Sequence, residues 1–274
     1  MHPFLLDIGG FKLPAYGFMI ALGYTAAIFY LYKSRAIACV SRDIEADLVF
    51  YSALAGILGA KAVFAVTYWS ELGPDLASRC IYVFKGFPYG FVFYGGFAAG
   101  AAAFLFYCRR NKLNFLKTAD HFAPALALAH AFGRLGCFLA GCCYGSPAGG
   151  APGVVFTNPL CEVPQAYLGV PLHPVQLYEA AGNFLIFGAL AWLSRRGLPR
   201  TLAPGHLEKV RGKGRAGGMI LAAYMLSYSV LRFMIEFLRG DDRGGSWLGL
   251  SPAQALSIVA AAAAAFMLIK IRKK

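Results

Sequence analysis

Residues Pro252–Lys270 read PAQALSIVAAAAAAFMLIK, an apolar run whose one charged residue stands at its end. A helix needs roughly 20 mostly apolar residues to cross the hydrocarbon core of a bilayer, because it rises about 1.5 Å per residue and satisfies its own backbone hydrogen bonds. The run is therefore predicted to be a transmembrane helix.

Six further stretches of the same kind precede this run. They lie at Ala15–Tyr32, Leu48–Trp69, Pro88–Tyr107, His121–Ala140, Leu177–Leu193 and Gly217–Phe237. The chain is therefore predicted to be an all-α, polytopic membrane protein with about seven transmembrane helices. No internal boundary separates a second domain, so residues 1–274 are expected to form a single integral membrane domain.

The composition of the 274-residue chain supports this class: 58% of the residues are hydrophobic, only 14% are charged, and the mean hydropathy is +0.57. Soluble domains are nearer to one quarter charged. A soluble core this apolar would have too little polar surface to stay dispersed. An ordinary cytosolic enzyme, a disordered chain and a secreted disulfide scaffold are therefore excluded.

The net charge of +13 is distributed unevenly along the chain. Most basic residues follow the first, third and fifth predicted helices or lie in the C-terminal tail, whereas the opposite side carries only Lys12, Arg79, Lys85, Arg239 and Arg243. The positive-inside rule then predicts an N-terminus outside and a C-terminus in the cytoplasm. The charge is attributed to topology and anionic headgroups rather than to nucleic acid. Residues 195–218 are predicted to be a mobile, basic cytoplasmic loop.

Three basic residues fall inside predicted spans: Lys61, Arg134 and Arg232. An unpaired cation in mid-membrane costs at least about 2.5 kcal/mol, so it normally has a partner or a watery cavity. For Lys61, a long stem that snorkels to the interface explains the residue equally well. The two arginines lie in polar clusters, and a functional role is favoured for both.

The fourth predicted span places His130, Arg134, Cys137 and Gly141 on one helical face. A guanidinium there suits a phosphodiester, since it keeps its charge and donates two parallel hydrogen bonds to phosphate oxygens. Further glycines at 133, 136 and 145 allow a bulky headgroup or a neighbouring helix to approach closely. His130 is either a satisfied interior residue or a catalyst.

The sixth predicted span carries Arg232, Glu236 and Arg239 at helical spacing, which makes a charged stripe toward the outer surface. A structural ladder of ion pairs is the alternative explanation. The fifth span begins with His173 and Gln176 at the outer mouth and has Glu179 one turn deeper. Interfacial capping explains the first two residues equally well, but a membrane-embedded glutamate points to function.

The third predicted span begins near Tyr94-Gly95-Gly96, where a phenol stands beside two unhindered backbone units. Tyrosine at an interface is ordinarily an anchor. The seven cysteines include no C-x-x-C pair and no Cys/His set of tetrahedral spacing, so a zinc site is disfavoured. Cys142 or Cys143 could form a disulfide with Cys161, or all could be small buried apolar residues.

Three motifs together resemble bacterial prolipoprotein diacylglyceryl transferases: Gly133-Arg134-Leu-Gly-x-Phe-x-x-Gly141, His173-Pro-x-Gln176-Leu-Tyr-Glu179 and Arg232-Phe-x-x-Glu236-Phe-x-Arg239. The resemblance covers nearly the whole chain. It implies a seven-helix enzyme of the inner membrane that moves the diacylglyceryl group of phosphatidylglycerol to the lipobox cysteine thiol of prolipoproteins, the first step of lipoprotein maturation. Membrane lipids would be its surroundings, and no metal or cofactor is implied.

The resemblance also implies roles for individual residues. Arg134 and Arg232 would hold the phosphate, and Glu179, Glu236 and Arg239 would order the cavity. The remaining expected substrate-binding residues are Tyr16, Lys61, Gly95, Gly96, Cys137, Gly141, Gly145, His173 and Gln176.

This chain departs from the best-known family pattern at three polar positions, with Tyr94 in place of His, Cys137 in place of Asn and Cys142 in place of Glu. The general base is therefore not identified by the resemblance. Tyrosine is a poor base at neutral pH because its pKa is about 10. One hypothesis is that His130 accepts the proton. The alternative is that Tyr94 only positions substrate and the phosphate-binding cluster acidifies the thiol directly.

Two other functions remain open from the sequence. One is a paralogous enzyme with the same lipid donor and a different acceptor, and the other is a non-catalytic lipid-binding or transport protein. Both would retain the phosphate-binding arginines. A channel is disfavoured, because polarity gathers on the outer halves of the helices instead of lining several of them throughout.

Overall fold

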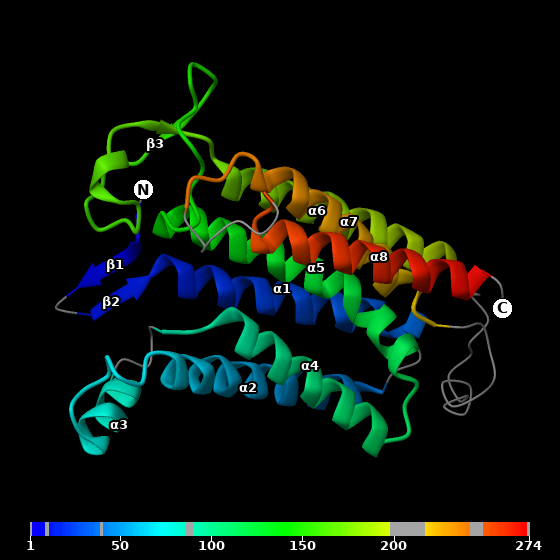
Figure 1. Ribbon diagram of the computed structural model, residues 1–274. Coiled ribbons are helices and arrows are strands. Elements are labelled where there is room, and N and C mark those ends of the chain that lie inside the picture. The colour runs from blue at the N-terminus through cyan, green and yellow to red at the C-terminus, as the bar shows by residue number, and fades with distance from the viewer. Residues whose placement is uncertain are drawn as a thin grey trace. The chain divides into compact units, whose positions relative to one another are not determined.

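The computed structural model describes residues 2–8, 11–38, 41–85, 90–197, 217–241 and 249–272 (Figure 1). Helices dominate the described chain. Their bounds are α1 Ala15–Ala38, α2 Arg42–Thr67, α3 Leu76–Lys85, α4 Phe93–Arg110, α5 Phe115–Ala140, α6 Val175–Gly197, α7 Met219–Glu236 and α8 Pro252–Arg272.

Within the described residues, six helices are long and apolar enough to cross a membrane: α1, α2, α5, α6, α7 and α8. The predicted class, an all-α polytopic membrane protein, is confirmed. The predicted span at Pro88–Tyr107 corresponds to α4, which is not among the six. Its 18 residues end in Arg109 and Arg110, and these two charges lower the mean hydropathy of so short a helix.

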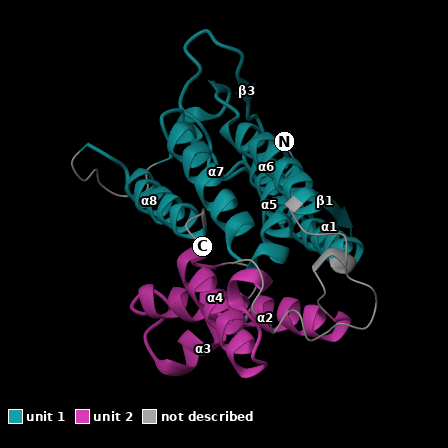
Figure 2. Ribbon diagram, turned by 90° about the vertical axis from the view of Figure 1, so that its right-hand side faces the viewer, with its two compact units in different colours: residues 1–38, 119–205, 214–274 teal, residues 39–118, 206–213 magenta. Residues whose placement is uncertain are grey.

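The chain forms two compact units (Figure 2). Unit 1 consists of residues 1–38, 119–205 and 214–274, and unit 2 of residues 39–118 and 206–213. The single membrane domain stays a prediction. Of the predicted basic loop, residues 198–216 lie outside the described residues, whereas Arg195 and Arg196 form the last turn of α6.

In unit 2, α2 and α4 pack through glycines. A Cβ added at Gly59 would lie 2.7 Å from the carbonyl oxygen of Gly95, and one at Gly96 would lie 3.0 Å from that of Gly56. The backbones of the two helices therefore lie closer together than a larger residue at either position would allow. The short helix α3 follows α2 and is initiated by Asp75, which accepts hydrogen bonds from the Ser78 amide and hydroxyl.

In unit 1, α1 and α5 run antiparallel. A Cβ on Gly136, near the end of α5, would lie 3.1 Å from the ring of Tyr16 at the start of α1. About two turns further along α1, a Cβ on Gly23 would lie 2.7 Å from Cβ of Phe132. Helices α5, α6 and α7 then share a small apolar core of Ala123, Ala127, Leu190 and Ile220.

The described chain also contains short strands, which the sequence pattern did not predict. They lie before α1 and between α5 and α6. Strands β1 (Phe4–Ile8) and β2 (Phe11–Pro14) form an antiparallel ribbon before α1. We call residues 141–174 the cap segment, which contains the paired strands β3 (Val154–Val155) and β4 (Pro171–Leu172). The cap segment has its own apolar core, formed by Phe156, Cys161, Val163 and Leu172.

Asp120 fixes the start of α7 against the start of α5. Its carboxylate accepts hydrogen bonds from the backbone N–H groups of Gly218 at 2.7 Å and Leu221 at 2.8 Å. A carboxylate at a helix N-terminus satisfies unpaired amides and interacts favourably with the helix dipole.

The Asp120→Ala substitution is expected to lower the free energy of unfolding by about 1–2 kcal/mol, because it removes both bonds at once. Denaturant titration of the purified protein in detergent measures the change. Glu71→Ala is the matched control, since Glu71 is exposed in a turn. Equal stability of the two variants would show that the Asp120 contacts contribute nothing.

Candidate active site

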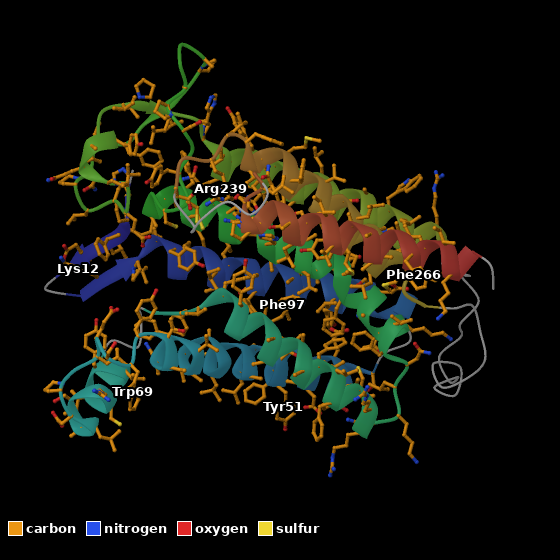
Figure 3. All side chains as sticks on the ribbon, in the orientation of Figure 1. Lys12, Tyr51, Trp69, Phe97, Arg239 and Phe266 are labelled. Atoms are coloured by element: carbon orange, nitrogen blue, oxygen red, sulfur yellow. The ribbon has the colours of Figure 1, made fainter. Side chains whose placement is uncertain are left out.

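Helices α5, α6 and α7 bring most of the predicted polar residues into one buried group at the end of unit 1 that carries the cap segment. We call this group the charged cluster, and its members are His130, Arg134, Glu179, Tyr228, Arg232, Glu236 and Arg239. Figure 3 shows Arg239 at this end of unit 1.

Glu179 is the centre of the charged cluster, and its side chain is only 1% exposed. Its Oε1 lies 3.0 Å from Nη2 of Arg134 and accepts a hydrogen bond of 2.9 Å from the Tyr228 hydroxyl. Its Oε2 lies 4.0 Å from Nη1 of Arg239. A buried carboxylate needs such partners, and here a single carboxylate joins side chains from α5, α7 and the turn after α7.

His130 lies beside Arg134 on α5, as the four-residue spacing predicts. Nε of Arg134 donates a hydrogen bond of 3.3 Å to Nε2 of His130. The same nitrogen lies 3.8 Å from Oε1 of Glu179. The His130 ring also lies 4.7 Å from the ring of Tyr228, measured between centroids.

The predicted stripe on α7 is formed. Arg232 is ion-paired with Glu236, and Nε of Arg239 lies 3.7 Å from Oε2 of Glu236. The hydroxyl of Ser251, at the start of α8, donates a hydrogen bond of 2.7 Å to Oε1 of Glu236. Arg239 also binds Asp241 in bidentate fashion, at 2.8 and 2.7 Å.

One donor of the charged cluster has no acceptor. Among the described residues, Nη2 of Arg232 is buried and has no hydrogen-bond partner, whereas Nη1 of Arg232 and Nη1 of Arg239 are at ion-pair distance from Glu236 and Glu179. Leaving charged donors unpaired in a buried site costs free energy, and such a site favours an anion with several acceptor oxygens. A phosphate group has that chemistry.

The predicted lining residues of unit 1 surround the end of α5. Tyr16 contacts α5 at Gly136, next to the buried thiol of Cys137. Gly141 ends the helix with a φ of +82°, and a Cβ there would lie 2.8 Å from Cβ of Cys161. Gly145 has no room either, since a Cβ would lie 2.3 Å from the carbonyl oxygen of His173.

His173 and Gln176 tie the cap segment to the start of α6. The backbone N–H of His173 donates to the carbonyl of Ser146 at 3.0 Å, and Nε2 of Gln176 donates to the carbonyl of Cys142 at 2.9 Å. The Gln176 side chain is fully buried. Both residues therefore tie the cap segment to the start of α6, and their role in substrate binding stays a prediction.

Four predicted site residues belong to unit 2, and the charged cluster contains none of them. The ammonium of Lys61 is buried and lies 5.4 Å from the ring of Phe64. Tyr94 is 61% exposed at the start of α4. Gly95 and Gly96 lie against α2, so close helix packing already accounts for their lack of a side chain.

Sequence reasoning missed Tyr228, which belongs to the charged cluster, and three residues that contact the cluster: Asn183, Asp241 and Ser251. Tyr228 precedes Arg232 by four residues, so the same helical spacing could have identified it. Asn183 likewise follows Glu179 by four residues, and its side-chain amide donates to the Glu179 carbonyl oxygen at 2.8 Å. Ser251 and Asp241 reach the charged cluster from loops, which helical spacing does not place.

Comparisons with known proteins agree with these motifs. Residues 3–270 match the model of the family described as prolipoprotein diacylglyceryl transferase. The phosphatidylglycerol–prolipoprotein diacylglyceryl transferase of Clostridium tetani is 35% identical over 260 residues, which cover 94% of this chain and 93% of the relative. A second transferase of that name from Clostridium perfringens is also 35% identical, and covers 94% and 91%.

A more distant relative with the same name, from Bordetella parapertussis, is 31% identical over 94% of this chain and 90% of its own length. The match to the family model runs through α1 to α8 and includes every residue of the charged cluster. The chain therefore belongs to the prolipoprotein diacylglyceryl transferase family.

Proposed function

We propose that this protein transfers the diacylglyceryl group of phosphatidylglycerol to the lipobox cysteine thiol of prolipoproteins. The observation that carries the proposal is the buried guanidinium of Arg232, whose Nη2 has no hydrogen-bond partner, in one cluster with Arg134 and Arg239 in a chain of this family. Relatives with 31–35% identity are named for this reaction.

The reaction requires a sulfur nucleophile to displace a phosphate ester. The bond between the glyceryl carbon and the phosphate oxygen breaks, a carbon–sulfur bond forms, and glycerol phosphate leaves with the electron pair. Negative charge develops on the leaving phosphate, so cationic donors aimed at its oxygens lower the barrier. Arg134 and Arg232 take this role, and Glu179 and Glu236 hold their guanidinium groups in place.

The thiol proton needs an acceptor, and His130 is the candidate within the charged cluster. Its Nε2 accepts a hydrogen bond from Arg134 in the structure. When a lipid phosphate accepts the Nε–H of Arg134 while Glu179 still holds Nη2, the His130 nitrogen is released and becomes available to the proton. The acceptor therefore becomes competent only when the lipid donor is bound.

His130→Gln is expected to reduce transfer by about 10²–10⁴-fold, the usual contribution of a general base. The variant should remain folded and bind phosphatidylglycerol, because glutamine preserves a hydrogen-bond acceptor for Arg134. Single-turnover transfer to a lipobox peptide and lipid binding are measured side by side. Unchanged transfer would remove His130 from the mechanism.

We also infer seven membrane spans. Because α1 begins where α5 ends, the chain between these two helices must cross the membrane an even number of times. Helix α2 is long and apolar enough for one crossing, and α3, with 10 residues, is too short for another. The second crossing is therefore α4.

The same argument supports the orientation. Seven crossings place the ends of α1, α4, α6 and α8 on one side, where basic residues gather: Lys33, Arg109, Arg110, Arg195, Arg196 and Lys270. This side is then the cytoplasm, and the charged cluster and cap segment face outward from the bacterial inner membrane. Anionic headgroups account for the basic charge, and nucleic acid has no part in the function.

A further inference from the structure

Three thiols meet at the end of α5. Cys137 lies in the last turn of the helix, which ends at Ala140. Cys142 and Cys143 follow after Gly141. Their Sγ atoms all lie within 4.8 Å of one another, and none of the three residues forms a disulfide in the structure. We call them the thiol triad.

The backbone holds the thiol triad in place. The N–H groups of Gly141 and Cys142 both donate to the carbonyl of Cys137, at 2.9 and 3.1 Å, so the chain folds back over the helix end. Cys143 adopts a φ of 57°, a left-handed conformation that is costly for a residue with a Cβ. The buried Gln176 fixes the intervening carbonyl of Cys142. The sequence spacing C-x-x-x-x-C-C alone does not reveal this convergence.

Three sulfur atoms around one point suit a soft metal ion. Zinc binds thiolate at about 2.3 Å, which places tetrahedral sulfur ligands about 3.8 Å apart. The limit of 4.8 Å on the separations in the thiol triad lies about 1 Å above that value. Soft thiolate ligands select zinc or copper(I) over hard cations.

The electrostatic surroundings suit thiolates that share a cation. Three thiolates and one divalent ion leave a net charge of −1. The Arg239 guanidinium interacts with Cys143 and offsets this charge.

We propose that Cys137, Cys142 and Cys143 bind one soft metal ion of the zinc class and leave its fourth coordination position to the acceptor thiol. Among the described residues, no further Cys, His, Asp or Glu joins the three within that radius. A metal site with three protein ligands keeps a position for substrate, unlike a closed structural site. Arg134, three residues before Cys137 on the same helical face, places phosphate binding beside it.

The role in transfer rests on the proposed function. A thiol that coordinates zinc is deprotonated outright, so the ion would convert the acceptor thiol to the nucleophilic thiolate. The released proton passes to His130. The coordinated sulfur would then form its bond to the glyceryl carbon as the carbon–oxygen bond breaks and glycerol phosphate leaves with the electron pair, a substitution that needs no oxidant or reductant.

Binding is tested with Co²⁺ as a spectroscopic probe on the purified, reduced and chelator-treated protein in detergent. We expect saturation at about one ion per chain, with thiolate-to-cobalt charge-transfer absorption. Cys142→Ser and Cys143→Ser should each weaken binding by more than about tenfold. Cys80→Ser, at an exposed position in unit 2, is the matched control and should bind as tightly as the wild type. Absence of saturable binding, or equal binding by all variants, would overturn the proposal.

The state of the thiols gives an independent check. Alkylation and mass spectrometry of the freshly purified protein should find all three cysteines reduced or protected by metal. A disulfide within the thiol triad, together with no affinity for Co²⁺ after reduction, would overturn the metal site and indicate a redox-active cysteine pair instead.

A second measurement separates this proposal from the proposed function. Addition of a lipobox peptide should shift the Co²⁺ absorption, and the same peptide with serine in place of its cysteine should not. Full transfer by metal-free protein would overturn the metal role and leave the transferase intact. Metal binding that responds to the peptide thiol, without any transfer from phosphatidylglycerol, would instead contradict the transferase.

Discussion

Replacing Arg134 by alanine is expected to reduce diacylglyceryl transfer by about 10²–10³-fold, the usual cost of removing one preorganised donor from a developing oxyanion. Arg134 is mostly buried and lies 3.0 Å from the carboxylate of Glu179, so its guanidinium is held in position before lipid binds. The rate constant of a single turnover with saturating phosphatidylglycerol is the quantity to measure.

Arg134→Lys separates charge from geometry. Lysine keeps the positive charge but loses the planar pair of parallel donors, so we expect only partial recovery of the rate. The unfolding midpoint of each variant shows whether lost activity reflects lost structure. An Arg134→Ala protein that is folded and transfers at the wild-type rate would contradict a phosphate-binding role for this residue.

The largest expected effect on stability comes from Glu179→Gln. This change keeps the shape of the side chain but removes the only carboxylate that contacts both Arg134 and Arg239 among the described residues. Removing one partner of a buried ion pair leaves an uncompensated charge and costs about 3–5 kcal/mol. The free energy of unfolding in detergent should fall by an amount in that range.

Glu162→Gln is the matched control for this prediction, because Glu162 is exposed in the cap segment. The same chemical change should leave stability almost unaffected there. If Glu179→Gln were as stable as Glu162→Gln, the charged cluster would not depend on a central carboxylate. Its cations would then need another source of neutralisation.

The helices could be predicted well from the sequence, because an apolar run of about 20 residues by itself indicates a membrane-spanning helix. Pro252–Lys270, for example, coincides with the body of α8. The exception is α4, where Arg109 and Arg110 shorten the apolar stretch. Only the packing of α1 against α5, which is a long-range contact, provides the additional argument for a crossing there.

The residues of the charged cluster were predictable where one helix carries them. His130 and Arg134 are four residues apart on α5, and Arg232 and Glu236 are four apart on α7, so their contacts follow from helix geometry. Contacts between helices were not predictable. The sequence placed Glu179 one turn into a helix, but not at the centre of a group that α5 and α7 complete.

The cap segment escaped sequence reasoning for a different physical reason. Its strands have two residues each, and backbone contacts at Gly145 and Gly240 set its path. Such short strands give no alternating pattern. The thiol triad depends in the same way on the left-handed turn at Gly141 and Cys143, because spacing along the chain does not specify where a turn directs side chains.

The most direct test of the proposed function is mass spectrometry of a lipobox peptide after incubation with the purified protein and phosphatidylglycerol. We predict that the peptide cysteine gains the mass of a diacylglyceryl group through a thioether bond, and that Arg134→Ala strongly reduces this product. A peptide of unchanged mass, recovered from wild-type protein that demonstrably binds phosphatidylglycerol, would contradict the transferase and favour another acceptor or a lipid-binding role.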